Sequence, residues 1–441
     1  MLRPAGGAIR RLGWGVADQG MSSVGNFAVS IYVVHQLGAV QFGAFSIAYV
    51  TYGFALNASR GLSTDPLMVR FSGVADRVWQ RAVRNCTGTA IAVGLVTGIC
   101  CLVAALALKG TSGAAFLALG ITLPGLMLQD SWRFSFFAHG RGFHAFLNDT
   151  VWTLTLLPSL VLLSKTGHAD VFWFTFAWGA SASVAALVGL LQSRVVPRLL
   201  GARIWLSEHS DLGVRYLLEG TSSSLVSQVR GYGTGLILGL AALGYLQASV
   251  TLYGPMTILF LGMGLVTIPE AARVLRRSPK HLPLFCVAVS VGLTLGGLLW
   301  GVALLIAVPR GLGHALLGPS VWRPTYPLVF PMMLWFLGQG VGGGAGTGLH
   351  GLGAAKRSLR VVLLVALMSA VITLGGSLVG GVQGTVYGMA ISAWIGSAMG
   401  WWQFRKAWHE SGRGTADISH KQTRRGGRHR KARTMRSQAL S

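Results

Sequence analysis

The stretch LGAVQFGAFSIAYVTYG at residues 37–53 returns in outline as LGLAALGYLQASVTLYG at residues 238–254. When the two are aligned on their first leucine, the glycines and the closing Tyr-Gly pair coincide: Gly38 with Gly239, Gly43 with Gly244, Tyr52 with Tyr253, and Gly53 with Gly254. Three more pairs of segments match, and all occur in the same order in the two copies. They are QGMSS (19–23) with EGTSS (219–223), GLSTDPLMVR (61–70) with GLVTIPEAAR (264–273), and HGRG (139–142) with HGLG (350–353). Ordered matches at a nearly constant offset predict an internal duplication.

The composition places the duplicated unit in a membrane. Of 441 residues, 52% are hydrophobic and only 11% are charged, whereas soluble domains carry roughly 25% charged residues. Segments such as 86–108, 284–308 and 361–381 contain almost no charge. They have the length of roughly 20 residues that an α-helix needs to cross the hydrocarbon core. We therefore predict an all-α polytopic membrane protein.

The hydropathy pattern predicts about twelve transmembrane helices, six in each copy. They lie near 12–37, 41–65, 84–108, 113–138, 145–164, 170–193, 212–238, 242–269, 282–308, 324–350, 358–381 and 383–406. Because six is even, both copies enter the membrane in the same direction, and the pseudo-two-fold axis lies along the membrane normal. This arrangement predicts two parallel six-helix lobes around a central cleft. The expected divisions are an N-terminal lobe (1–193), a cytoplasmic linker (194–211), a C-terminal lobe (212–406) and a basic disordered cytoplasmic tail (407–441).

The net charge of +25 is distributed as in an inner-membrane protein. If the N-terminus is cytoplasmic, the outside loops hold only Lys109, Lys165, Arg310 and Arg323, and all other loop and tail cations lie inside. The positive-inside rule then predicts that both termini are cytoplasmic. The basic tail would attract anionic membrane lipids. Nucleic-acid binding is disfavoured beside so many spans.

Polar residues recur with helical spacing in spans one, two and seven. At 3.6 residues per turn they share one face of each helix, and lipid does not tolerate such faces. We expect them to line a hydrated cleft, although a buried polar seam between helices is the alternative. The candidate cleft-lining residues are Asp18, Ser22, Asn26, Asn57, Glu219, Ser223 and Ser227.

Three arginines at membrane depth are candidate ligands for an anion: Arg60, Arg133 and Arg230. The planar guanidinium matches phosphate oxygens. Arg133 could instead pair locally with Asp130, three residues earlier, and Arg60 could extend to the inner surface. Buried carboxylates couple transport to Na⁺ or H⁺ in many carriers, and the candidates here are Asp18, Asp130 and Glu219, for which a purely structural role is the alternative. We expect no cofactor, no metal site and no disulfide.

Several of these segments resemble a known family. HQLGAVQFGAFSIA (35–48), ALLGPSVWRPTYPLVFPMML (315–334) and HGRG (139–142) are similar to the loose glycine and apolar patterns of polysaccharide-export and lipid-linked oligosaccharide flippases. That family belongs to a superfamily that also contains multidrug and toxic-compound extruders. The resemblance implies two six-helix lobes, a central cleft and rocking between inward-open and outward-open states. It also implies a polyprenyl-pyrophosphate-linked glycan as substrate, with glycosyltransferases or a polymerase of the same pathway as partners.

The sequence therefore predicts a transporter of a lipid-linked saccharide precursor for cell-surface polysaccharide synthesis. An ion-coupled multidrug antiporter of the same superfamily remains the alternative. A membrane-embedded glycosyltransferase or polymerase is less favoured, because the outside loops are short and Asp170 is the only carboxylate near one. Such an enzyme needs acidic residues or a bound metal for its chemistry.

Overall fold

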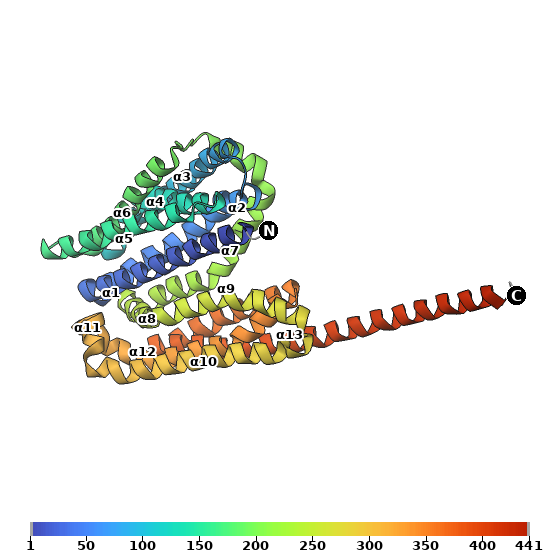
Figure 1. Ribbon diagram of the computed structural model, residues 1–441. Helices are drawn as coiled ribbons and strands as arrows, with labels where there is room; N and C mark the ends of the chain where they lie inside the picture. Colours follow the sequence, from blue (N-terminus) through green and yellow to red (C-terminus); the bar gives the residue numbers. More distant parts are fainter. Residues whose placement is uncertain (1–2, 439–441) are drawn as a thin grey trace. The chain divides into compact units, whose positions relative to one another are not determined.

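The computed structural model describes the backbone of residues 3–438 and the side chains of residues 14, 17–218, 228–260, 262–263, 266–268, 270–354 and 357–410. Every regular element of this backbone is a helix, as the predicted fold class requires (Figure 1). The first elements are α1 (Arg3–Ser59), the π-helix η1 (Arg60–Thr64), α2 (Asp65–Arg70), α3 (Asp76–Ala107), α4 (Gly110–Ala138), α5 (Gly142–Lys165) and α6 (Val171–Ser193). They are followed by α7 (Gly201–Leu238), α8 (Leu240–Leu252), α9 (Gly254–Arg277), η2 (Pro279–His281), α10 (Leu282–Ala307), η3 (Val308–Leu312), α11 (Gly313–Leu317), α12 (Pro319–Gly351) and α13 (Ala355–Gln438).

Among the described residues, eight helical segments are long and apolar enough to cross a membrane. Two of them, Ala17–Arg70 and Arg357–Glu410, are 54 residues long, and each covers two predicted spans. Helix α7 covers predicted span seven, and the side chains of its residues 219–227 lie outside the described residues. The chain is therefore a multi-pass membrane protein that crosses with helices.

The two matching glycines of the duplicated stretch adopt the same backbone conformation. Gly38 bends α1 with φ 69° and ψ 176°, and Gly239 separates α7 from α8 with φ 84° and ψ 171°. An L-residue with a side chain pays a steric penalty in this left-handed region, whereas glycine does not. The repeated sequence thus encodes a repeated bend between one span and the next.

The next pair of matching glycines makes a reciprocal contact between the two copies. A Cβ placed on Gly43 would lie 1.9 Å from the carbonyl oxygen of Leu240, and one placed on Gly244 would lie 2.1 Å from that of Ala39. Ala39 and Leu240 are themselves equivalent, each following its bend. The second span of each copy therefore packs its glycine against the backbone of the other, as a local two-fold relation requires.

The chain divides into two compact units. Unit 1 consists of Met1–Pro255, Gly301–Met332 and Ser369–Met389. Its core includes Trp79, Trp132, Phe136 and Trp205, all almost fully buried. The predicted lobe boundaries at residues 193 and 212 stay predictions.

Trp205 shows that part of the predicted linker belongs to unit 1. Helix α7 begins at Gly201 and continues without interruption through span seven. The indole nitrogen of Trp205 donates to the carbonyl oxygen of Leu62 over 3.1 Å. Residues 201–211 of the predicted 194–211 linker are thus the first turns of α7, and Trp205 joins them to η1 within unit 1.

Unit 2 consists of Met256–Trp300, Met333–Met368 and Ala390–Ser441. Glycines of α12 allow close helix contact in its core: a Cβ on Gly344 would lie 1.9 Å from the carbonyl oxygen of Cys286. The core includes Cys286, Leu349 and Phe404, which are almost completely buried. Small residues let two helix backbones approach in this way.

Helix α13 continues through residues 407–438, as Figure 1 shows. The segment extends an existing helix and needs no new nucleus, which is the costly step in helix formation. The predicted disorder of the tail stays a prediction.

Candidate functional site

A cavity of about 330 Å³ lies within unit 1, between α1, α4, α5 and α6. Its lining combines polar and aromatic side chains. The polar lining residues are Asp18, Gln19, Ser22, Asn26, Arg60, Gln129, Asp130, Arg133 and Asp149. Five of these side chains are formally charged, although they lie within membrane-spanning helices.

Arg60 reaches the cavity from the π-helical turn η1. The amide of Asp65 donates to the carbonyl oxygen of Arg60, which closes the wider turn; such turns are frequent at functional sites. The neighbouring Gly61 lets α7 pass closely, since a Cβ there would lie 2.5 Å from the backbone nitrogen of Leu217. Sequence and packing together therefore place the arginine at a local irregularity of the helix.

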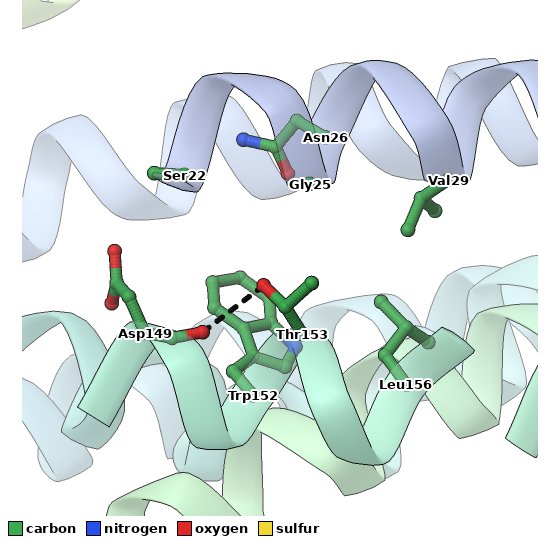
Figure 2. A pocket seen from close by; sticks show the side chains of 8 residues that line it. All are labelled: Ser22, Gly25, Asn26, Val29, Asp149, Trp152, Thr153 and Leu156. Atoms are coloured by element: carbon green, nitrogen blue, oxygen red, sulfur yellow. Dashed lines mark hydrogen bonds between the residues drawn. The ribbon is translucent and has the colours of Figure 1, made fainter. Parts of the chain in front are cut away.

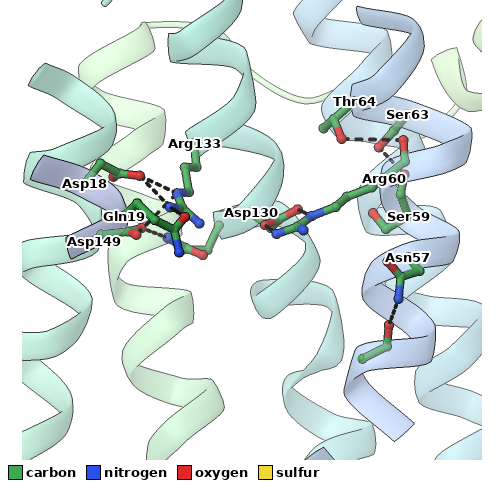
Figure 3. Close-up of polar contacts among 12 residues, drawn as sticks. Asp18, Gln19, Asn57, Ser59, Arg60, Ser63, Thr64, Asp130, Arg133 and Asp149 are labelled. Atoms are coloured by element: carbon green, nitrogen blue, oxygen red, sulfur yellow. Dashed lines mark hydrogen bonds and ion pairs between the residues drawn. The ribbon is translucent and has the colours of Figure 1, made fainter. Parts of the chain in front are cut away.

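Arg60 forms a two-pronged ion pair with Asp130 (Figure 3). Its Nε donates to Oδ2 over 3.0 Å, and its Nη2 donates to Oδ1 over 2.6 Å. The guanidinium also lies over the ring of Phe134, with 4.8 Å between Cζ and the ring centroid. Asp130 is 6% exposed and Arg60 is 29% exposed, so the arginine retains access to the cavity.

Arg133 makes a second charged group with two other aspartates (Figure 3). Its Nε donates to Oδ2 of Asp18 over 2.8 Å and lies 3.4 Å from Oδ2 of Asp149. The amide of Gln129 donates to Asp149 over 2.8 Å. The predicted local pair between Arg133 and Asp130 is therefore wrong: each arginine pairs with a carboxylate on another helix.

These charges do not balance. Two guanidinium groups face three carboxylates, Asp18, Asp130 and Asp149. One oxygen of Asp18, Oδ1, is buried and has no hydrogen-bond partner among the described residues. An ionised carboxylate oxygen without a partner is costly away from water. The group therefore has room for one more positive charge, and its guanidinium forks are shaped for bidentate oxyanions.

Aromatic side chains also line the cavity. They are Tyr49, Tyr52, Phe134, Phe137, Trp152 and Trp178. The ring of Tyr52 meets that of Trp178 edge to face, with centroids 4.8 Å apart, and Trp152 donates from its indole nitrogen to the carbonyl oxygen of Trp178 over 3.2 Å. These contacts hold the rings of Tyr52, Trp152 and Trp178 together, so the cavity combines flat aromatic surface with charged groups.

A second, much smaller space lies between α1 and α5, next to Asp149 (Figure 2). Its volume is about 10 Å³, close to the minimum that one water molecule needs. Ser22, Asn26 and Thr153 contribute polar groups to its wall, and Thr153 donates to the carbonyl oxygen of Asp149 over 3.0 Å. Among the described residues no group of three or more His, Cys, Asp and Glu side chains could hold a metal ion.

The structure brings most of the predicted site residues together. Asp18, Ser22, Asn26, Arg60, Asp130 and Arg133 all line the larger cavity. Arg230 and Asn57 are not among its described lining residues, and the amide of Asn57 donates to the carbonyl oxygen of Gly53 on its own helix over 2.9 Å. The side chains of Glu219, Ser223 and Ser227 lie outside the described residues.

Sequence reasoning missed several cavity residues, among them Gln129, Asp149, Trp152 and Trp178. A signal for Asp149 was present, because a carboxylate interrupts an otherwise apolar span. Intramembrane carboxylates mark functional sites often enough to be candidates on that ground alone. The two tryptophans carried no such signal, since aromatic residues are common throughout apolar helices.

No protein-family model matches this sequence, and no curated protein matches it. Solved structures do match. An inward-facing MATE-family multidrug resistance transporter of the MOP superfamily is 14% identical, with a TM-score of 0.71 over 88% of this chain and 95% of that chain. The lipid II flippase MurJ, in an inward closed conformation, is 13% identical, with a TM-score of 0.65 over 91% of this chain and 90% of that chain.

An outward-facing MATE-family transporter is also similar, with 15% identity and a TM-score of 0.55 over 89% of this chain and 93% of that chain. At these identities the likeness concerns the fold. The chain therefore has the two-lobed helical fold of the MATE transporters and of MurJ, as the resemblance in its sequence predicts.

Proposed function

We propose that this protein moves a saccharide linked to polyprenyl pyrophosphate across the cytoplasmic membrane by alternating access. The observation that carries the proposal is the cavity of unit 1, whose lining combines the guanidinium groups of Arg60 and Arg133 with aromatic side chains. Pyrophosphate oxygens suit the two guanidinium forks, and sugar rings have flat C–H faces that suit the aromatic side chains. One of the solved structures with this fold is described as a lipid II flippase.

The ion pairs suggest how substrate binding is coupled to a cation. A pyrophosphate oxygen pair has the same shape as the Asp130 carboxylate in its contact with Arg60. When the substrate takes the guanidinium, the carboxylate loses its partner while it remains largely buried. A buried unpaired charge is costly, so Asp130 then takes up a proton or Na⁺. Asp18 and Asp149 respond in the same way around Arg133.

An ion-coupled small-molecule antiporter is the second candidate. The observation in its favour is the excess of carboxylates over arginines in the cavity, which would attract a cation with an aromatic ring. Another solved structure with this fold is described as a multidrug resistance transporter. The enzyme alternative has no support from the fold, since the similar solved structures are transporters and a flippase.

The experiment is translocation in proteoliposomes with a fluorescent undecaprenyl-pyrophosphate-linked disaccharide. An impermeant reductant that quenches the fluorophore measures the share in the outer leaflet. We expect the wild-type protein to make the inner-leaflet share accessible, and Arg133→Gln to abolish this. Arg70→Gln is the matched control, because Arg70 pairs with the exposed Asp211 and not in the cavity. Equal transport by Arg133→Gln would exclude Arg133 from substrate binding.

A further inference from the structure

Unit 2 contains a cavity of its own, also of about 330 Å³, between α9, α10 and α12. All ten residues that line it are uncharged. Those that matter most are Thr257, Phe260, Met263, Trp335, Gln339 and Thr347. Its chemistry is therefore unlike that of the charged cavity in unit 1.

The register of the duplication explains the difference. Arg60 stands directly before GLSTDP in the first copy, and Met263 stands directly before GLVTIP in the second. Asp130 stands nine residues before HGRG, and Val341 stands nine residues before HGLG. The ion pair of the first cavity thus corresponds to methionine and valine in the second copy. Met263 lines the second cavity and Val341 is not among its described lining residues, so the charged pair is not repeated there.

The walls of the second cavity combine aromatic rings with hydrogen-bonding groups. Phe336 meets Trp335 edge to face, with centroids 4.7 Å apart, and the hydroxyl groups of Thr267 and Thr347 lie 3.1 Å from each other. Gln339 exposes its side chain to the cavity. Among the described residues its amide makes no hydrogen bond, although it lies in a membrane-spanning helix.

These features exclude two classes of ligand. A charged group would lose its hydration here without gaining an opposite charge, which is strongly unfavourable. A purely apolar ring would cover the amide of Gln339 without offering it a partner, which costs about 1–3 kcal/mol. The ligand should therefore be uncharged, and it should present both a flat apolar face and hydroxyl groups.

We propose that this cavity binds an uncharged pyranose ring of the transported saccharide. The C–H face of the ring lies on Trp335, and its hydroxyl groups bond to Gln339 and the threonines. The volume is within the range of small-ligand sites. The inference rests on the proposed function for the identity of the ligand as a part of the substrate, but the binding itself is measured without transport.

The test uses the full-length protein in lipid nanodiscs, labelled with 5-fluorotryptophan and observed by fluorine NMR. Trp335→Phe identifies the signal of that residue. Methyl glycosides of glucose, galactose, rhamnose and N-acetylglucosamine are titrated, with naphthalene and inorganic pyrophosphate for comparison. We expect at least one glycoside to shift the Trp335 signal saturably. Gln339→Leu should weaken this binding about tenfold, which corresponds to the loss of one hydrogen bond.

Arg70→Gln, at a residue that pairs with Asp211 and lines neither cavity, is the control and should leave the glycoside titration unchanged. A saturable shift with naphthalene but with no glycoside would overturn the proposal, as would unchanged affinity in Gln339→Leu. Translocation of the lipid-linked disaccharide without glycoside binding would contradict only this inference. Glycoside binding without any translocation would contradict only the proposed function.

Discussion

The duplication supplies its own substitutions for testing the Arg60–Asp130 ion pair. Arg60→Met and Asp130→Val each install the residue that the second copy carries at the equivalent position. Asp130 is only 6% exposed, so removing Arg60 leaves a buried carboxylate unpaired. We expect Arg60→Met to cost about 3 kcal/mol, at the low end of values for broken buried pairs because the cavity admits water.

Asp130→Val, which removes the other partner of the ion pair, should cost less, because Arg60 is 29% exposed and reaches water in the cavity. We expect a loss of about 1–2 kcal/mol in the free energy of unfolding. The double variant has no uncompensated charge, and apolar replacement of a buried ion pair is often neutral or stabilising. It should therefore lie within about 1 kcal/mol of the wild type, which makes the two changes non-additive by at least about 3 kcal/mol.

Equilibrium unfolding in mixed micelles of dodecyl maltoside and dodecyl sulfate, followed by circular dichroism at about pH 8, measures these differences. The same four proteins are then assayed for translocation in vesicles. We expect the double variant to be stable but inactive, since it has lost a substrate ligand. Additive single costs would refute the ion-pair reasoning. A stable double variant with wild-type transport would show that the pair is structural only.

Three other changes test separate parts of the account. Gly43→Ala should cost about 1–3 kcal/mol because its Cβ would overlap the backbone of α8. Gly53→Ala, in the same helix, is the control and should be neutral or slightly stabilising, since the nearest atom to its Cβ would be 3.9 Å away. Equal stability of the two variants in the same unfolding assay would contradict the reciprocal contact. Asp149→Asn should reduce the proton or Na⁺ uptake that accompanies translocation, and unchanged uptake, measured with an enclosed ion-sensitive dye, would remove Asp149 from the coupling. Burial and the nearby Arg141 lower the pKa of His139 in the folded protein, although Asp76 opposes this shift. The stability that His139 contributes is therefore present above its unfolded pKa of about 6.5 and is lost as the pH falls through its lower folded pKa. His139→Gln should make the free energy of unfolding less dependent on pH in this range, and an unchanged slope in unfolding measured at several pH values would contradict this.

The sequence predicted those features that depend on local periodicity. Helical spacing placed Asp18, Ser22 and Asn26 on one face of α1, and these residues line the same cavity. The repeated Leu-Gly pair predicted an internal duplication, and Gly38 and Gly239 do adopt matching bends. Each of these features is decided within one helix or one turn.

Partners across helices were harder to predict, because they depend on how each helix is rotated in the packed unit. The spacing of three residues favoured a pair between Asp130 and Arg133, yet each side chain points to a different neighbouring helix. Arg230, like Arg60 and Arg133, was predicted to lie at membrane depth, but it is not among the described residues that line the cavity. The position of a residue along a helix does not determine which way its side chain faces.

The central claim concerns the cargo, and the most direct measurement presents both candidate cargoes to the same vesicles. Wild-type protein is reconstituted with an imposed proton or Na⁺ gradient. Translocation of the undecaprenyl-pyrophosphate-linked disaccharide is then followed alongside transport of ethidium, an aromatic cation. The account predicts that the disaccharide crosses and that ethidium does not compete with it. Gradient-driven ethidium transport with no movement of the lipid-linked disaccharide would contradict it.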